Sequence, residues 1–275
     1  MDKTSSPQGT LPRNESGAAK AQRVMVRLRP IPVVLFIIGF IILVFSSVVV
    51  HSHPKPYPID LQTTYAIQST TLAPPITAFM NFISAINNPL PSIIALGVWL
   101  IGLCLIGLIA RARGKSPVKW FEAAAGIIGT VGIASGVNYI FNVLVNRPRP
   151  GSFSGEHVHV LSHIPEKSFP SGHTDHDLAY YGFLLFLSFT LPVSQWKYRW
   201  ILIPLQIYCV LDILFIGYSR ILEGEHWLTD VLAGYLSGAL WLLMCIFLYR
   251  QFTGWIELKL QARYQGGACP RPGQR

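Results

Sequence analysis

The stretch YSRILEGEHWLTD, residues 218–230, links two long apolar runs at 200–219 and 231–249. A helix needs about 20 mostly apolar residues to cross a hydrocarbon layer ~30 Å thick, and both runs approach that length. The link holds an arginine, a histidine and three carboxylates. A charge near the bilayer centre costs about 2.5–3.5 kcal/mol on insertion scales, so packing alone does not explain this group. We interpret the runs as membrane helices and the link as a candidate functional site.

Four further apolar blocks extend this interpretation to the whole chain. The 275 residues are 51% hydrophobic and only 13% charged, which leaves no polar half for a soluble surface. Inside a bilayer every backbone polar group needs an internal partner, and a helix supplies one. We therefore predict an all-α polytopic membrane protein with six transmembrane helices in a bundle. The first four spans are expected at 31–50, 89–110, 123–145 and 178–193, the last of which is the shortest.

The net charge of +9 could indicate a nucleic-acid partner, but the positions of the basic residues indicate membrane orientation instead. Most of the 22 lysines and arginines fall in the two ends of the chain, at 111–119 and at 197–199. Cytoplasmic segments are enriched in lysine and arginine. We expect a plasma-membrane protein with both termini in the cytoplasm. The polar segments 146–177 and 218–230 then lie together on the outer face.

The chain divides by composition into four parts. Residues 1–22 are rich in Ser, Gly, Pro and charge and are predicted to be a disordered cytoplasmic tail. Residues 23–118 hold the first two spans and an outer loop, whose stretch 76–86 could form an interfacial helix. Residues 119–252 are predicted to be the catalytic core of spans three to six, and 253–275 a cytoplasmic tail.

The segment FPSGHTDHD, residues 169–177, precedes an apolar helix directly. Such a turn exposes the backbone N–H groups of Ser171, Gly172 and His173 at a helix N-terminus, which attracts anions. A simpler alternative is that Ser171 only caps the helix. His173 would stand beside any phosphate bound there.

Two other polar segments could complete an anion site. NRPRP, residues 146–150, presents Arg147 and Arg149, whose planar guanidinium groups match phosphate oxygens; alternatively they only reach the lipid head groups. His226 and Asp230 are four residues apart and share a helix face, so the carboxylate could accept the imidazole N–H. Arg220 is close enough in the chain to fold over the same place.

These three segments resemble the motifs of the type 2 phosphatidic acid phosphatase superfamily. NVLVNRPRP, PSGH and SRILEGEHWLTD match the family pattern in order and internal spacing, over about 90 residues. One position departs from the pattern, because Asn142 stands where the family has a lysine. An amide can donate a hydrogen bond to phosphate but brings no charge. Arg147 could supply part of the missing charge.

The resemblance implies a metal-independent and cofactor-free phosphatase. His226 would attack phosphorus and form a phosphohistidine, Asp230 would orient the ring, and His173 would protonate the leaving group. The phosphate oxygens would be held by Arg149, Arg220, Asn142 and the N–H groups of Ser171 and Gly172. The implied partners are the bilayer and a lipid phosphate, namely a prenyl (undecaprenyl) pyrophosphate, phosphatidylglycerol phosphate or phosphatidate.

Several alternatives stay open at this point. The chain could be a phosphatase of soluble esters, a weakened relative that binds or moves phospholipids, or a vanadate-dependent peroxidase. His157, His159, His163 and His176 with Asp175 and Asp177 fit no closed metal-ligand spacing, so we interpret them as a solvated loop. We expect Glu223 and Glu225 to be solvated as well. Asp212 lies inside a span and needs a partner, for which we suggest Asn142 or an arginine.

Overall fold

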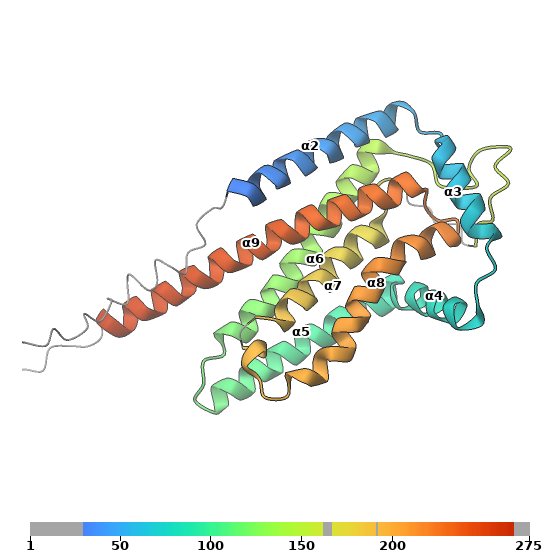
Figure 1. Ribbon diagram of the computed structural model, residues 1–275. Coiled ribbons are helices and arrows are strands. Elements are labelled where there is room, and N and C mark those ends of the chain that lie inside the picture. The colour runs from blue at the N-terminus through green and yellow to red at the C-terminus, as the bar shows by residue number, and fades with distance from the viewer. Residues whose placement is uncertain (1–29, 162–166, 191, 267–275) are drawn as a thin grey trace, which may run out of the picture. The chain divides into compact units, whose positions relative to one another are not determined.

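The computed structural model describes residues 30–161, 167–190 and 192–266, and within these ranges it contains helices and no strand. Arg29–Tyr249 form one compact unit, and Arg250–Gly266, which continue the last helix, belong to a separate unit. Figure 1 shows the order of the elements along the chain. The helices are α2 (Pro30–Ser52), α3 (Pro58–Ser69), α4 (Pro74–Ile86), α5 (Pro89–Ala112), α6 (Val118–Val145), α7 (Gly172–Ser188), α8 (Ile203–Leu222) and α9 (Leu228–Gly266), with short 3-10 turns at Val193–Gln195 and Arg199–Leu202.

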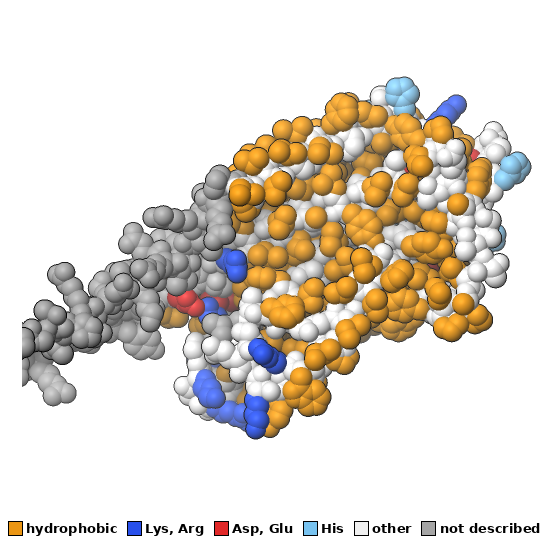
Figure 2. Space-filling model, in the orientation of Figure 1, with side chains coloured by type: hydrophobic (Ala, Val, Ile, Leu, Met, Phe, Trp, Pro, Cys, Tyr) orange, Lys and Arg blue, Asp and Glu red, His pale blue; other side chains and the backbone are white. Residues whose placement is uncertain are grey.

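Five of these helical segments are long and apolar enough to cross a membrane, which fits an integral multi-pass membrane protein. Their outer faces carry large apolar side chains, for example Ile93 at 66% and Leu214 at 63% exposure. Figure 2 shows apolar side chains over the visible face of the helices, with lysines and arginines near the α5–α6 connection. The segments are Ile31–Ser52, Pro89–Ala112, Val118–Val145, Arg199–Leu222 and Leu228–Leu260.

The remaining predicted span, 178–193, corresponds to α7 but is displaced from it. The helix begins at Gly172 and ends at Ser188, so polar residues that we predicted to be a loop form its first turns. Ser171 caps the helix, because its side chain accepts a hydrogen bond from the backbone N–H of Thr174. Thr174 itself is buried inside the protein, so these turns do not face solvent. Figure 1 shows α7 between α6 and α8, against which it packs. With 17 residues α7 is shorter than the five apolar segments, so the count of six spans stays a prediction.

Glycines in α9 allow it to pack closely against α7. A Cβ atom at Gly234 would lie 2.7 Å from the carbonyl oxygen of Ser171, and one at Gly238 would lie 2.7 Å from that of Asp175. Small residues spaced in this way let two helix backbones approach each other. The contact sets the position of the first turn of α7, which carries His173, relative to the start of α9.

The segment predicted to be an outer loop contains two short helices. The stretch for which we suggested an interfacial helix lies within α4 (Pro74–Ile86), which packs against α8. Asn87 follows α4 directly and donates a hydrogen bond of 2.8 Å to Asp212 in α8. Asp60 in α3 is fully buried and reaches the start of α9, where the Thr229 N–H donates to it at 2.9 Å. Both short helices are therefore fastened to the helices that carry the polar motifs.

Candidate active site

His226 lies in the turn between α8 and α9 and is almost fully buried. Gly224 makes this turn possible, because its φ of +68° is strained for other residues. The Nδ1 atom of His226 is 2.8 Å from the carbonyl oxygen of Ser168. A carbonyl oxygen only accepts hydrogen bonds, so Nδ1 carries the hydrogen and the lone pair is on Nε2. Nε2 lies 3.3 Å from Nη1 of Arg149, so the unprotonated nitrogen stands beside a fixed positive charge.

Asp230 orients His226 less directly than we expected. Its Oδ2 atom is 4.0 Å from His226 Nδ1, beyond hydrogen-bond distance. The carboxylate instead accepts hydrogen bonds from the Ser168 hydroxyl and, at 2.9 Å, from the backbone N–H of Trp227. Ser168 thus contacts both groups, its carbonyl holding the histidine and its hydroxyl holding the aspartate. We did not predict Ser168, although it lies only two residues before the Pro170–His173 motif.

Arg147 does not reach the phosphate side of the site, which corrects our suggestion that it supplies charge there. It is fully buried and pairs with Asp230 at 2.5 Å and with Asp60 at 2.8 Å. Its Nη1 also donates to Thr229. A buried guanidinium between two carboxylates is a structural ion-pair cluster that holds Asp230 in place. Asp60 is far away in the sequence, and no motif indicated its role.

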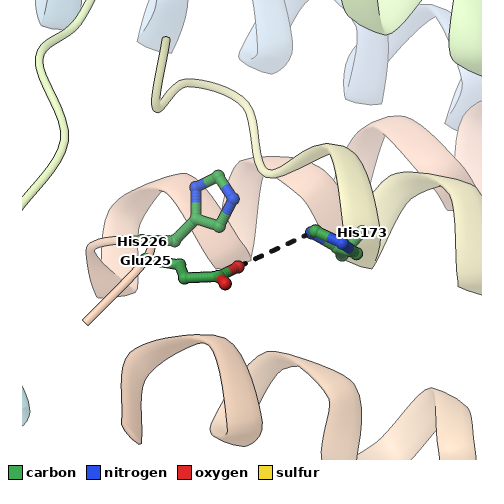
Figure 3. A group of neighbouring side chains, drawn as sticks. All are labelled: His173, Glu225 and His226. Carbon is green, nitrogen blue, oxygen red and sulfur yellow. Dashed lines mark ion pairs between the residues drawn. The ribbon is translucent and has the colours of Figure 1, made fainter. Parts of the chain in front are cut away.

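His173, Glu225 and His226 face one another across the site (Figure 3). The Nδ1 atom of His173 is 3.9 Å from Glu225 Oε2, and the two imidazole ring centroids are 6.5 Å apart. Glu225 is 5% exposed, so our expectation of a solvated loop charge is wrong. Its Oε2 lies 2.7 Å from Nη1 of Arg220, whose Nη2 lies 3.1 Å from Glu223. Arg220 is fully buried behind these carboxylates.

The electrostatics of the site favour neutral histidines in the free protein. Burial lowers the pKa of His226 well below its usual value, and the nearby charges of Arg149 and Arg220 act in the same direction. Burial and then the charges of Arg220 and Arg149 lower the pKa of His173 to about 3. A neutral imidazole is the form that can attack phosphorus. A bound phosphate dianion would offset the arginine charges and raise both pKa values.

A cavity of about 700 Å³ is lined by His226 at one end and continues between α5 and α6. Volumes of this size are typical of small-molecule sites. One end is polar and the rest of the wall is mainly apolar. The polar end is lined by Asn142, Arg149, Lys167, Gly172, His173, His176, Glu225 and His226, and the wall along α5 and α6 includes Ile93, Leu96, Val131, Asn138 and Tyr139.

Three predicted phosphate ligands are engaged elsewhere in the structure. The backbone N–H of Ser171 donates to the carbonyl of Asp230 at 3.0 Å, and its hydroxyl caps α7, so Ser171 does not present a free N–H. Arg220 is covered by Glu225, as described above. The amide of Asn142 donates to the carbonyl of Lys167 at 2.8 Å and accepts from its N–H at 3.2 Å. Arg149 and Gly172 do line the cavity.

Asp212 has other partners than those we suggested. Within the described part of the chain it accepts hydrogen bonds from Asn87 at 2.8 Å and from the Tyr208 hydroxyl at 3.0 Å. Asp175 and Asp177 are buried in α7, not solvated. His176 lines the cavity, whereas His163 falls outside the described residues.

His173, Glu225 and His226 also offer potential metal-ligand atoms within 4.8 Å of one another. Two neighbouring charges disfavour a cation at this place. Arg149 lies 3.3 Å from the free nitrogen of His226, and Arg220 pairs with Glu225 at 2.7 Å. Positive groups at these distances repel a metal ion and attract an anion. The arrangement fits a phosphate better than a metal.

The chain resembles known proteins over the same helices. Residues 123–254 match the family model described as the PAP2 superfamily. This segment is therefore similar to the PAP2 superfamily. It contains the three motifs and the residues that line the polar end of the cavity.

Two solved structures are similar to this chain. One is the crystal structure of the first transmembrane PAP2 type phosphatidylglycerolphosphate phosphatase from Bacillus subtilis, with 21% identity, a TM-score of 0.55, and coverage of 78% of this chain and 93% of that one. The other is the crystal structure of Aquifex aeolicus LpxE, with 19% identity, a TM-score of 0.47, and coverage of 69% and 96%. No curated protein matches the chain.

Proposed function

We propose that this protein is a phosphatase of lipid phosphates or pyrophosphates that acts through a phosphohistidine on His226. One observation carries the proposal. The Nδ1 hydrogen of His226 is held by the Ser168 carbonyl, which leaves the Nε2 lone pair facing a cavity that Arg149 and His173 also line. A nucleophile, a proton donor and a fixed cation then meet at one point, as phosphoryl transfer requires.

The reaction proceeds in two displacements. His173 becomes protonated when the phosphate dianion binds, because the dianion raises its pKa. The Nε2 lone pair then forms a bond to phosphorus while the bond from phosphorus to the leaving oxygen breaks, and His173 gives that oxygen its proton. His173 then takes a proton from water, whose oxygen attacks phosphorus as the N–P bond breaks and its electron pair returns to Nε2. Orthophosphate leaves. Asp230, held by Arg147 and Ser168, stabilises the charged imidazole from 4.0 Å.

The shape of the cavity supports a lipid substrate. Its polar end can hold a phosphate, and its apolar wall between α5 and α6 can hold part of a hydrocarbon chain. Prenyl pyrophosphate, phosphatidylglycerol phosphate and phosphatidate have this division. The solved structure from Bacillus subtilis is a phosphatidylglycerolphosphate phosphatase by its description, which agrees with this class.

The proposal includes a location and an orientation. The protein resides in the plasma membrane with both termini in the cytoplasm, and the active site faces outward. The clustering of basic residues near the α5–α6 connection, at the far end of α6 from Arg149, supports this orientation.

The test is phosphate release by the purified full-length protein in lipid vesicles, with a chelator present. We expect release from lipid phosphates by the parent and a loss of at least about 10³-fold in His226→Ala, since the nucleophile is removed. His157→Ala is the matched control, because His157 is exposed and does not line the cavity. Acid-labile, alkali-stable labelling by a radioactive substrate should appear in the parent and be absent in His226→Ala.

Other outcomes would identify the alternatives. Release from soluble sugar phosphates alone would contradict the lipid assignment. Lipid binding that persists in His226→Ala, without any phosphate release by the parent, would indicate a binding or lipid-moving protein. The replacement of lysine by Asn142 is the feature that keeps this second function in view.

A further inference from the structure

The positive charge around the cavity is distributed in an unexpected way. Among the described residues that line it, the lysines and arginines are Arg149 and Lys167. Arg220 is fully buried, and Glu225 lies between its Nη1 and His173. The transferred phosphoryl group spreads its charge over three equatorial oxygens in the transition state. A second cation at the cavity wall would therefore be valuable for both binding and catalysis.

Lys167 is fixed at this wall by Asn142. The Asn142 side chain donates to the Lys167 carbonyl at 2.8 Å and accepts from the Lys167 N–H at 3.2 Å. It also lies 3.4 Å from the carbonyl of Phe169. An amide side chain that binds both the N–H and the C=O of one residue fixes the position of that residue's backbone. Asn142 itself lines the cavity near the end of α6. The backbone of Lys167 is therefore held beside the polar end of the cavity.

The next residue anchors Lys167 from the other side. Ser168 donates its N–H to the Arg147 carbonyl at 2.9 Å, and its own carbonyl holds His226 Nδ1 at 2.8 Å. Asn142 and Ser168 thus fix the backbone of Lys167 on two sides, whereas the side chain of Lys167 is exposed. The lysine stem has four carbons and flexible torsions, so its ammonium can adjust to a phosphate oxygen.

We propose that Lys167 is the second cation of the phosphate site and that Asn142 is the residue that positions it. This inference rests on the proposed function. In this chain the second positive charge comes from Lys167, in the loop before Pro170. Asn142 holds the backbone of that residue in place. Lys167 contacts a phosphate oxygen as a direct ligand, whereas Asn142 acts through it.

The first test compares three variants with the parent by steady-state kinetics on a lipid phosphate. We expect Lys167→Ala to reduce kcat/KM by about 10²-fold, the scale for losing one charged donor to a transition state. Lys167→Arg should keep kcat/KM within tenfold of the parent, because the charge is retained. Lys55→Ala is the matched control, since Lys55 is exposed and does not line the cavity, and it should act like the parent.

The positioning role predicts how the changes combine. Asn142→Ala should weaken kcat/KM by about tenfold in the parent and have little further effect in Lys167→Ala, because contacts in one network are not additive. Asn142→Lys in the Lys167→Ala background should restore part of the activity, since it returns a charge to the same wall. Additive losses, or an absence of rescue, would overturn the assigned role of Asn142.

A second measurement separates this inference from the proposed function. Orthovanadate binding to the purified protein, followed by calorimetry, should weaken at least tenfold in Lys167→Ala and stay unchanged in Lys55→Ala. Vanadate binding needs no turnover, so it tests whether Lys167 contributes to anion binding even if no phosphate ester is hydrolysed. Equal kcat/KM and equal vanadate affinity in the parent and a folded Lys167→Ala variant would refute the inference; thermal unfolding checks the folding.

Discussion

The most informative single residue is His226, because its two nitrogens have different tasks. Nδ1 is tied to the Ser168 carbonyl at 2.8 Å, which leaves Nε2 as the free base beside Arg149. Hydrogen bonding to a carbonyl selects the tautomer without placing a full charge directly on the ring. The charge of Asp230 stays 4.0 Å away and is shared with Arg147. Burial and the neighbouring arginines therefore keep the imidazole of His226 neutral in the ligand-free protein.

The histidines make the stability of the free protein depend on pH. The pKa of His173 is lowered to about 3 and that of His226 is also lowered, so both stay neutral in the folded state while the unfolded chain binds protons near pH 6.5. Stability then falls as the pH drops below 6.5, because the unfolded state binds more protons there. At pH 5 His173 alone should cost roughly 2 kcal/mol. Thermal unfolding of the ligand-free protein between pH 5 and 8 measures this slope.

Substitution identifies the source of the slope. His173→Gln should flatten the pH dependence of the unfolding temperature, whereas His157→Gln should leave it unchanged because His157 is exposed. A slope that is the same in the parent and in His173→Gln would show that His173 is not held neutral by its surroundings.

At the scale of elements, the contact between α7 and α9 determines how the two histidines face each other. His173 belongs to the first turn of α7, and His226 lies two residues before Leu228, the first residue of α9. The Ser171 N–H donates to the Asp230 carbonyl at 3.0 Å, and glycines allow the backbones to approach. The distance between the two imidazole rings is thus set by helix packing.

Gly238→Ala should disturb this packing. Its Cβ would lie 2.7 Å from the Asp175 carbonyl oxygen, so the helices must move apart. We expect about 1–3 kcal/mol of destabilisation and a decrease in kcat, measured by thermal unfolding and phosphate release. The control is Gly132→Ala in α6, where an added Cβ meets nothing within 4 Å. Equal stability and activity of the two variants would argue against a role for the contact.

The sequence predicted the elements better than it predicted the contacts between them. Uninterrupted apolar runs are visible without a structure, and five of them correspond to long apolar helices. The start of α7 was misplaced because its polar first turns, including Asp175 and Asp177, are buried in the protein. Hydropathy cannot distinguish a solvated polar loop from a polar helix end that is enclosed by neighbours.

The motifs predicted several residues that the structure brings together around the cavity, but not all of their partners. The spacing of His226 and Asp230 suggested a direct contact, and the structure inserts Ser168 between them. Arg147 looked like a phosphate ligand because the sequence did not show that Asp60 would bury it. Such pairings join residues far apart in the chain, and local spacing contains no information about them.

At the scale of the whole molecule, the cavity between α5 and α6 predicts how substrates are selected. Leu96 lines its apolar wall on α5. Leu96→Trp should narrow the apolar part of the cavity. We expect kcat/KM for a long-chain lipid phosphate to fall by at least tenfold, with little effect on a short-chain soluble analogue. The two substrates are compared with the same purified variant.

Ile101→Trp provides the control for this change. Ile101 is on the same helix, 64% exposed, and does not line the cavity, so the added ring should face the surrounding lipid. Equal losses for the long-chain and short-chain substrates in Leu96→Trp would mean that the hydrocarbon chain binds elsewhere.

The buried side chain of Arg147 limits how far this protein can be truncated from its amino-terminal end. It connects Asp230 to Asp60, and Asp60 belongs to α3, upstream of the PAP2 match that begins at residue 123. A fragment trimmed to the boundaries of that match would leave the guanidinium with one of its two carboxylates and Thr229 without its anchor. The helix α3, which begins at residue 58, therefore supplies contacts that hold the start of α9 and the Asp230 side chain in place, although it lies outside the matched segment.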